Sequence, residues 1–257
     1  YPTVAAPVIN RQDVTREASP DSFAGTTQVT FTSETDTVVF YTTDGTYPTA
    51  ESLSENTLTI TTTTTFIARA FRDIDGVLIP CSPIARRTFV NTDEFNAAVG
   101  LGMEGFSFFT DGDRPWMNKL MVDNTMKETP AVGTDRLRPG QSSSLYLDFT
   151  MEEEGLLSFE QYYSYYYQYD SRGEFVIFDA DHNEVQFQKT ATYLNFGNWY
   201  KHTLTLPAGT YTAVWTLTVP ETDFSGPSLA IDDFRAGSLR CTLTLLADPV
   251  TGGKTYA

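Results

Sequence analysis

Short segments in which apolar and polar residues alternate recur along the chain, and they predict β-strands. In the first third of the chain they cover residues 28–32, 37–43, 58–61, 64–72 and 83–90. Later segments lie at 140–147, 155–159, 206–215 and 229–234, and most of these follow a Gly or a Pro. Alternation over about four to eight residues between turn residues is typical of half-buried antiparallel strands. No long Ala/Leu/Glu run with a helical period is present, so we expect an all-β protein.

Composition supports this prediction and limits the number of domains. Thr, Val, Tyr and Phe, which favour strands, dominate the apolar segments. With 40% hydrophobic and 14% aromatic residues the chain is globular, and 257 residues suffice for one large or two modest domains. We expect a first module at 1–92, a short joint at 93–100, a second module at 101–247, and the start of a linker or further module at 248–257. The ends, Tyr1 and the Gly252–Thr255 segment, are interpreted as those of an excised piece of a longer protein.

The first module contains a short motif that resembles a known family. After the segment at 37–43, Asp44 and Gly45 form a turn signal, because Gly adopts a positive φ at no steric cost. The string YTTDGTYPT at 41–49, with VTF at 29–31 and TTFIARA at 64–70, resembles the β-sandwich associated with fibronectin type III domains. It is also similar to the C-terminal domain of chitobiase and β-hexosaminidase. The resemblance implies a small Ig-like β-sandwich that acts as a spacer without catalytic residues.

The second module resembles another group through several short motifs in series. These are the FTDGDRPW string at 109–116, SSSL at 142–145, GLLSF at 155–159, LPAGTY at 206–211 and AIDDF at 230–234. Together they resemble bacterial jelly-roll domains related to MAM and cleaved-adhesin modules. The resemblance implies a larger, concanavalin-like double-sheet sandwich with a calcium ion near one end. The charged turn at 152–154 and the tyrosine-rich segment at 161–172 depart from the pattern.

The charge balance narrows the choice of partners. A formal net charge of −16 would repel nucleic acid and anionic lipid, and no apolar run is long enough to span a membrane. We therefore expect an extracellular glycan or a host or matrix protein as partner, together with other domains of the same chain. The acidic surface either attracts cations, above all calcium, or only keeps an exported protein soluble. Cys81 and Cys241 fall in different predicted modules, so we expect two free, buried thiols, and a disulfide between them is the alternative.

Five acidic residues in three places along the chain are the candidate metal ligands. Asp111 and Asp113 lie in one loop, Asp232 and Asp233 end a strand segment, and Glu104 is the third candidate. Calcium takes about six to eight oxygen ligands, and carboxylates from distant segments can meet where sheets converge. Strand alternation predicts that only one of Asp232 and Asp233 faces outward. The alternative is a solvated turn and a salt-bridged strand end. Any calcium would be structural.

Aromatic residues are the candidate ligand-binding groups. In a strand, Tyr163, Tyr165, Tyr167 and Tyr169 would line one face, which would suit stacking on sugar rings if that face is exposed. The alternative is cross-strand packing inside the sandwich. Trp199 is expected to be semi-exposed, and Trp116 is either a binding platform or part of the core. Trp215 shares a face with Tyr211, Ala213 and Leu217, a pattern that indicates core.

No motif for catalysis is apparent. His182 is expected in a hairpin loop and His202 in a strand with an alternating polar face. Gly-x-Ser-x-Gly is absent, and no motif selects a carboxylate pair for glycoside hydrolysis. We expect a non-catalytic fragment of a bacterial secreted or cell-surface protein, with adhesion or carbohydrate binding through the jelly roll. The alternatives are a purely structural stalk that presents neighbouring domains, or an accessory module of a glycoside hydrolase.

Overall fold

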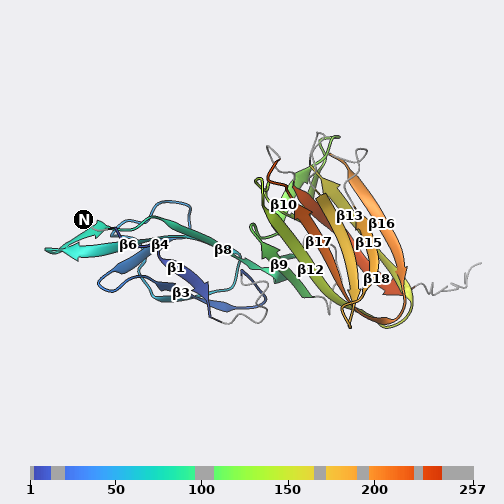
Figure 1. The fold of residues 1–257 in the computed structure, drawn as a ribbon, viewed down its shortest axis with the longest axis horizontal. Coiled ribbons are helices and arrows are strands. Elements are labelled where there is room, and N and C mark those ends of the chain that lie inside the picture. The colour runs from blue at the N-terminus through green and yellow to red at the C-terminus, as the bar shows by residue number, and fades with distance from the viewer. Residues whose placement is uncertain are drawn as a thin grey trace, which may run out of the picture.

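The computed structural model describes residues 3–12, 21–95, 107–164, 172–189, 197–222 and 228–238. Within these ranges the chain is almost entirely β-structure, arranged as two lobes that meet where β8 is followed by β9 (Figure 1). This confirms the prediction of a small sandwich followed by a larger jelly-roll sandwich. No helix among the described residues is long and apolar enough to cross a membrane.

The first lobe is a sandwich of a three-stranded and a five-stranded sheet. The smaller sheet has the order β1-β3-β5, with β1 (Val8–Arg11), β3 (Thr27–Thr32) and β5 (Thr57–Ile60). The larger follows β2-β8-β6-β4, with β7 paired to β6. Its strands are β2 (Ser22–Phe23), β4 (Val38–Thr42), β6 (Thr64–Ile74), β7 (Val77–Pro80) and β8 (Ala85–Asn91). An aromatic cluster fills the space between the sheets, in which Phe31 stacks on Tyr41 with ring centroids 4.3 Å apart.

The second lobe is a sandwich of two five-stranded sheets. The sheet named here the β12 sheet has the order β15-β14-β17-β12-β9, and the β13 sheet has the order β10-β11-β18-β13-β16. The strands of the β12 sheet are β9 (Ser107–Gly112), β12 (Ser142–Met151), β14 (Arg172–Asp179), β15 (Glu184–Lys189) and β17 (Gly209–Thr218). Those of the β13 sheet are β10 (Met117–Val122), β11 (Glu128–Gly133), β13 (Gly155–Tyr163), β16 (Trp199–Leu206) and β18 (Leu229–Ser238).

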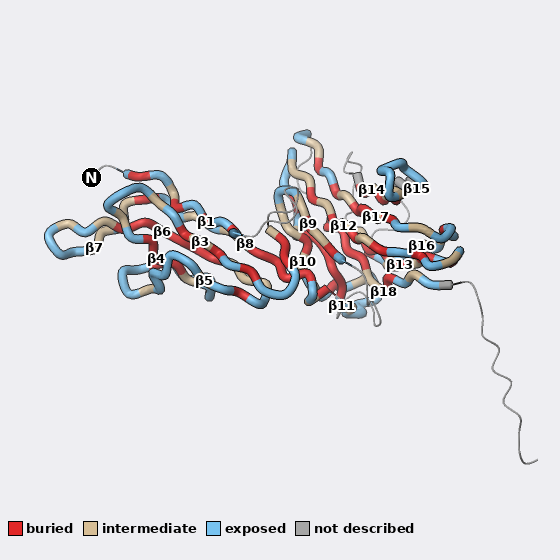
Figure 2. Tube along the Cα trace, turned by 90° about the horizontal axis from the view of Figure 1, so that it is seen from below, coloured by how far each residue is buried: buried red, intermediate tan, exposed pale blue. Residues whose placement is uncertain are grey.

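One large hydrophobic core lies between these two sheets. Trp215, Phe159 and Phe175 are fully buried at its centre, and Trp215 meets the Phe159 ring edge-on at 5.2 Å. Buried and less buried positions alternate along the central strands (Figure 2). The prediction that Trp215 belongs to the core is confirmed.

The joint between the lobes is short and anchored on both sides. It contains a 3-10 helix, η1 (Thr92–Phe95), in which Asp93 Oδ2 accepts a 2.6 Å hydrogen bond from Gly25 N. Phe95 is fully buried in the core of the second lobe, 5.8 Å from the ring of Phe108. Ser22 Oγ also accepts a 3.3 Å hydrogen bond from Thr110 N. Together these contacts hold the two lobes against each other.

Candidate functional site

The outward face of the β12 sheet combines aromatic, aliphatic and polar side chains, and strict alternation along β12 creates it. Leu145, Leu147 and Phe149 point into the core, where they are buried. Tyr146 and Asp148 lie between them in the sequence and therefore on the outward face, where both are half-buried. We call this outward surface the β12 face.

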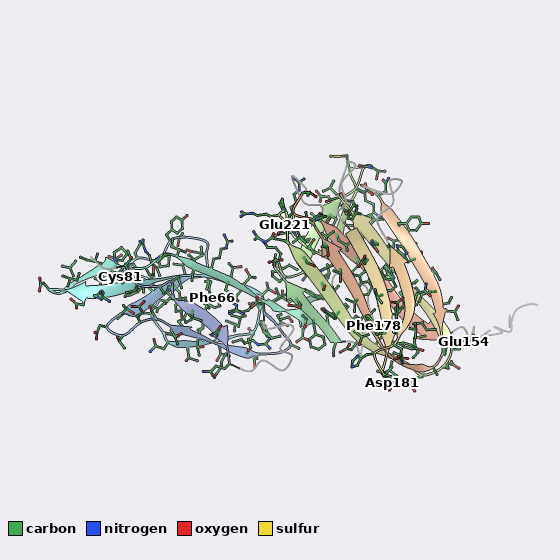
Figure 3. The ribbon with its side chains drawn as sticks, viewed as in Figure 1. Phe66, Cys81, Glu154, Phe178, Asp181 and Glu221 are labelled. Atoms are coloured by element: carbon green, nitrogen blue, oxygen red, sulfur yellow. The ribbon has the colours of Figure 1, made fainter. Side chains whose placement is uncertain are left out.

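Strand pairing extends Tyr146 into an apolar row across four strands. Phe109 of β9 and Val214 of β17 each pair directly with Tyr146, and Val176 of β14 pairs with Val214. Directly paired residues of antiparallel strands point to the same side, so all four lie on the β12 face. Phe178, labelled in Figure 3, lies two residues beyond Val176 on the same face of β14 and pairs with Thr212. Phe109, Tyr146, Val176 and Phe178 are half-buried, and Val214 is 8% exposed.

Polar pairs between β12 and β17 border this row on both sides. Ser144 and Thr216 hydroxyls lie 2.9 Å apart on one side, and the Thr212 hydroxyl donates to Asp148 Oδ1 at 2.7 Å on the other. Farther out, Ser142 pairs with Thr218 at 3.2 Å and Thr150 with Thr210 at 3.3 Å. The face therefore offers a flat apolar strip between two sets of hydroxyl groups whose positions are fixed by cross-strand hydrogen bonds.

Two further carboxylates lie along one side of the strip. Asp111 pairs with Ser144, and Glu174 pairs with Thr216, so both belong to the same cross-strand row. Ionised carboxylates only accept hydrogen bonds, so they suit ligands rich in hydroxyl donors. An apolar strip beside such acceptors matches a sugar ring, which has C–H groups on its faces and hydroxyls around its edge.

Trp116 does not lie on a binding surface, which corrects one of the two alternatives for this residue. Its side chain is fully buried in the core of the second lobe. The physical reason is its position in the loop between β9 and β10, which passes from the edge of one sheet to the edge of the other. A large apolar side chain in such a crossing fills the space between the sheets. Its backbone is fixed there by a 2.7 Å hydrogen bond from Trp116 N to Thr110 Oγ1.

Trp199 and Tyr163 lie on opposite faces of the β13 sheet. Trp199 pairs directly with Tyr162, and their ring centroids lie 5.5 Å apart, so these two residues share the outward face. Trp199 is half-buried, as expected, while the Tyr162 hydroxyl donates to Val122 O at 3.1 Å. Tyr163 is half-buried against the core between the sheets. A single aromatic face through Tyr163 and Trp199 is therefore not formed. Tyr165, Tyr167 and Tyr169 lie outside the described residues.

The predicted metal ligands are distributed over two sheets. Asp111 and Asp113 lie at the β9 edge of the β12 sheet, where Asp113 Oδ2 accepts a 2.8 Å hydrogen bond from Ser142 N. Asp232 and Asp233 belong to β18 in the other sheet, and Glu104 lies outside the described residues. Among the residues that the structure describes, no group of three or more His, Cys, Asp or Glu could hold a metal ion. The described carboxylates do not fit one calcium site, and calcium binding stays a prediction.

A β-bulge changes the expected orientation at Asp232 and Asp233. The register between β13 and β18 shifts between Ser158 and Glu160, and Asp233 has a φ of 47°. Ile231 and Phe234 are both buried, so the two aspartates between them are placed on the outward side. The prediction that only one of them faces outward is wrong, because the bulge inserts one extra residue. Burial is the main cause that raises the pKa of Asp232, and nearby Asp233 and Glu160 raise it further.

The two histidines and Cys81 are the remaining side chains for which the sequence predicted a position. His182 lies in the turn after β14 with a φ of 62°, as expected of a loop residue. His202 lies in β16, a strand with an alternating polar face, as expected; it occupies the core side, where its ring stacks on Phe159 at 4.8 Å. Cys81 is a free thiol and half-exposed rather than buried, and Cys241 lies outside the described residues.

Sequence reasoning did not single out the β12 face. The signal was present, because residues 142–151 alternate strictly between side chains that enter the core and side chains that do not. What the sequence does not contain is the pairing register, which brings Phe109, Tyr146 and Val214 from separate segments into one row.

Comparison with known families agrees with the motif at the start of the chain. Residues 18–76 match the family described as the chitobiase/β-hexosaminidase C-terminal domain, which confirms the predicted resemblance of the first module. No curated protein matches the chain in sequence.

Solved structures with similar folds include modules that bind carbohydrate. A carbohydrate-binding module of the β-sandwich superfamily is 13% identical and has a TM-score of 0.35, over 90% of this chain and 98% of its own. The module TmCBM61, solved with β-1,4-galactotriose, is 14% identical with a TM-score of 0.36, over 55% and 92%. The K3 cleaved adhesin domain of Lys-gingipain from Porphyromonas gingivalis is 19% identical with a TM-score of 0.32, over 43% and 74%. Similarity at this level carries no argument about fold or function.

Proposed function

We propose that the chain is a pair of non-catalytic modules from a bacterial secreted or cell-surface protein, and that the second module binds an extracellular glycan across the β12 face. The observation that carries this proposal is the apolar row through Phe109, Tyr146 and Val214, bordered by fixed hydroxyl and carboxylate groups. In this arrangement one sugar ring stacks on Tyr146, while its hydroxyls bond to the polar pairs on either side.

Tyr146 is the residue on which the proposal is best tested. The purified chain is screened on an array of neutral and acidic glycans, and affinity for each hit is measured by calorimetry. We expect Tyr146→Ala to weaken binding on the order of tenfold to a hundredfold, the range found when a central aromatic contact is truncated. Tyr47→Ala is the matched control, because Tyr47 is 72% exposed and lies in the first lobe.

The other outcomes distinguish the alternatives. A blank array, or a glycan whose affinity is the same for Tyr146→Ala and Tyr47→Ala, would contradict binding at the β12 face. Loss of binding in Trp199→Ala but not in Tyr146→Ala would move the site to the outward face of the β13 sheet. Repeating the array in chelator tests the predicted calcium, since a hit lost in chelator requires a bound cation.

A structural stalk is the second candidate, and the joint between the lobes favours it. η1 bonds to the first lobe through Asp93 and inserts Phe95 into the core of the second lobe. A spacer that presents a neighbouring domain at a fixed distance needs such a rigid joint, whereas a binding module does not. An accessory role beside a glycoside hydrolase would appear as a catalytic domain in the same full-length polypeptide.

A further inference from the structure

A cavity of about 310 Å³ lies in the first lobe, away from the β12 face. Its walls come from three places: strand β6, the segment from β7 to Pro83, and the N-terminal segment at Thr3. Cys81, one of its lining residues, is labelled in Figure 3 in the part of the first lobe that lies away from the second. A cavity of this size is comparable to the lower end of small-molecule sites, about 300 Å³.

Two arginines line this cavity in a chain whose net charge is −16. Arg69 donates a 2.9 Å hydrogen bond from Nε to Ser82 O, which fixes its guanidinium beside the segment that forms one wall. Arg72 is half-buried, and among the described residues no carboxylate forms an ion pair with either arginine. Two partly desolvated guanidinium groups without a counter-ion attract an anion.

The rest of the lining is largely apolar. Ile74, Ile79 and Pro83 contribute to the walls, and no carboxylate is among the described residues that line the cavity. A ligand that fits both features has an anionic group at one end and a compact carbon skeleton at the other.

We propose that this cavity binds a carboxylate-bearing ligand of about the size of one sugar ring, with Arg72 as the group that holds its carboxylate and Arg69 as a second positive charge in the lining. The source of the carboxylate is either an acidic saccharide unit or a small organic acid. The site is separate from the β12 face, so carboxylate binding here can be tested independently of glycan binding by the second lobe.

Cys81 makes the proposal testable without a known ligand. This residue lines the cavity, and its Sγ, 3.4 Å from Ala70 O, reacts with alkylating agents as the thiolate displaces iodide from carbon. Iodoacetate carries a carboxylate, and iodoacetamide is its neutral counterpart of similar shape. The ratio of the two alkylation rates at Cys81, measured by mass spectrometry of its peptide, reports attraction of a carboxylate. Changes in ionisation of the thiol affect both reagents alike and cancel in this ratio.

We expect Arg72→Gln to lower the ratio of iodoacetate to iodoacetamide rates on the order of fivefold, as removal of one charge at roughly 8 Å in a partly solvated site would do. Arg86→Gln is the matched control, because Arg86 is exposed, lies on β8, and does not line the cavity. Equal ratios in the unmodified chain, Arg72→Gln and Arg86→Gln would overturn the proposal.

Protection of Cys81 from iodoacetamide then distinguishes the two sources. Protection by millimolar glucuronate but not by propionate or glucose supports an acidic saccharide, and protection by propionate as well supports a general carboxylate site. If none of the three compounds slows alkylation, or if glucose protects as well as glucuronate, the cavity does not select a carboxylate and the proposal is wrong.

Discussion

At the scale of single residues, His202 shows how strand pairing can turn a polar side chain inward. Its position opposite Phe159 in the ladder places the imidazole on the core side of β16, stacked on the Phe159 ring and edge-on to Tyr200. Burial disfavours the charged imidazolium, so the pKa of His202 lies below its ordinary value. The ring is therefore uncharged at neutral pH.

This position predicts a pH-dependent stability of the second lobe. As the pH falls below about 6.5, the unfolded chain takes up a proton at His202 before the folded chain does. Stability is therefore fully present above that pH, falls as the pH decreases toward the lower folded pKa, and then levels off for this group. We expect His202→Phe to reduce the loss of stability between pH 7 and pH 5, measured by denaturant unfolding.

The control for this measurement is the other histidine of the chain. His182 is exposed in a turn with a positive φ, so His182→Asn keeps the backbone conformation while it removes the imidazole. An unchanged pH profile in His202→Phe, or an equal change in His182→Asn, would show that burial of His202 does not cause the effect.

At the scale of elements, the start of β13 depends on a close approach between two strands. Gly155 pairs with Ser238 of β18, and a Cβ at position 155 would lie 2.1 Å from Gly237 O and 2.6 Å from Met151 Cε. The oxygen belongs to the backbone of the neighbouring strand and cannot move aside without breaking the ladder. The glycine is therefore required by space and not by its φ.

We expect Gly155→Ala to destabilise the second lobe by about 1–3 kcal/mol, the usual cost of overpacking. Gly237→Ala is the matched control, because a Cβ at position 237 would meet nothing within 4 Å. Thermal and denaturant melts of both variants measure the difference. A Gly155→Ala variant as stable as Gly237→Ala would mean that the strands separate more easily than the pairing indicates.

At the scale of the whole molecule, η1 is the element that couples the lobes. Glu94 accepts a 2.8 Å hydrogen bond from Thr63 N of the first lobe, and its backbone oxygen accepts a 3.1 Å bond from Asn118 Nδ2 of the second. Val90 at the end of β8 also belongs to the core cluster of the second lobe. The folding of each lobe therefore contributes to the stability of the other.

Phe95→Ala tests this coupling. All three tryptophans, at 116, 199 and 215, lie in the second lobe, so their fluorescence reports its unfolding within the intact chain. Truncation of a fully buried Phe costs about 3–5 kcal/mol, and we expect a matching decrease in the free energy of unfolding of that lobe. Leu53→Ala, at a position 57% exposed in the first lobe, is the control. An equal effect in both variants would mean that Phe95 does not join the lobes.

The class of fold and about half of the described strands were predicted from the sequence alone. Alternation predicted β3, β4, β5, β6 and β8 in the first lobe and parts of β12, β13, β17 and β18 in the second, because a strand with one buried face must alternate. Strands β1, β2 and β7, of two to four residues, were not predicted, and neither were the longer strands β9, β10, β11, β14 and β15. Asp44 and Gly45 also predicted a turn, and the φ of 88° at Gly45 confirms it.

The tertiary structure decided which side chains share a surface. Register brought Phe109, Tyr146 and Val214 into one row and separated Tyr163 from Trp199. The crossing between sheets buried Trp116, and the bulge at Asp233 turned two adjacent acids to one side. These outcomes depend on contacts between residues far apart in the chain, and alternation describes only which residues of one strand share a face.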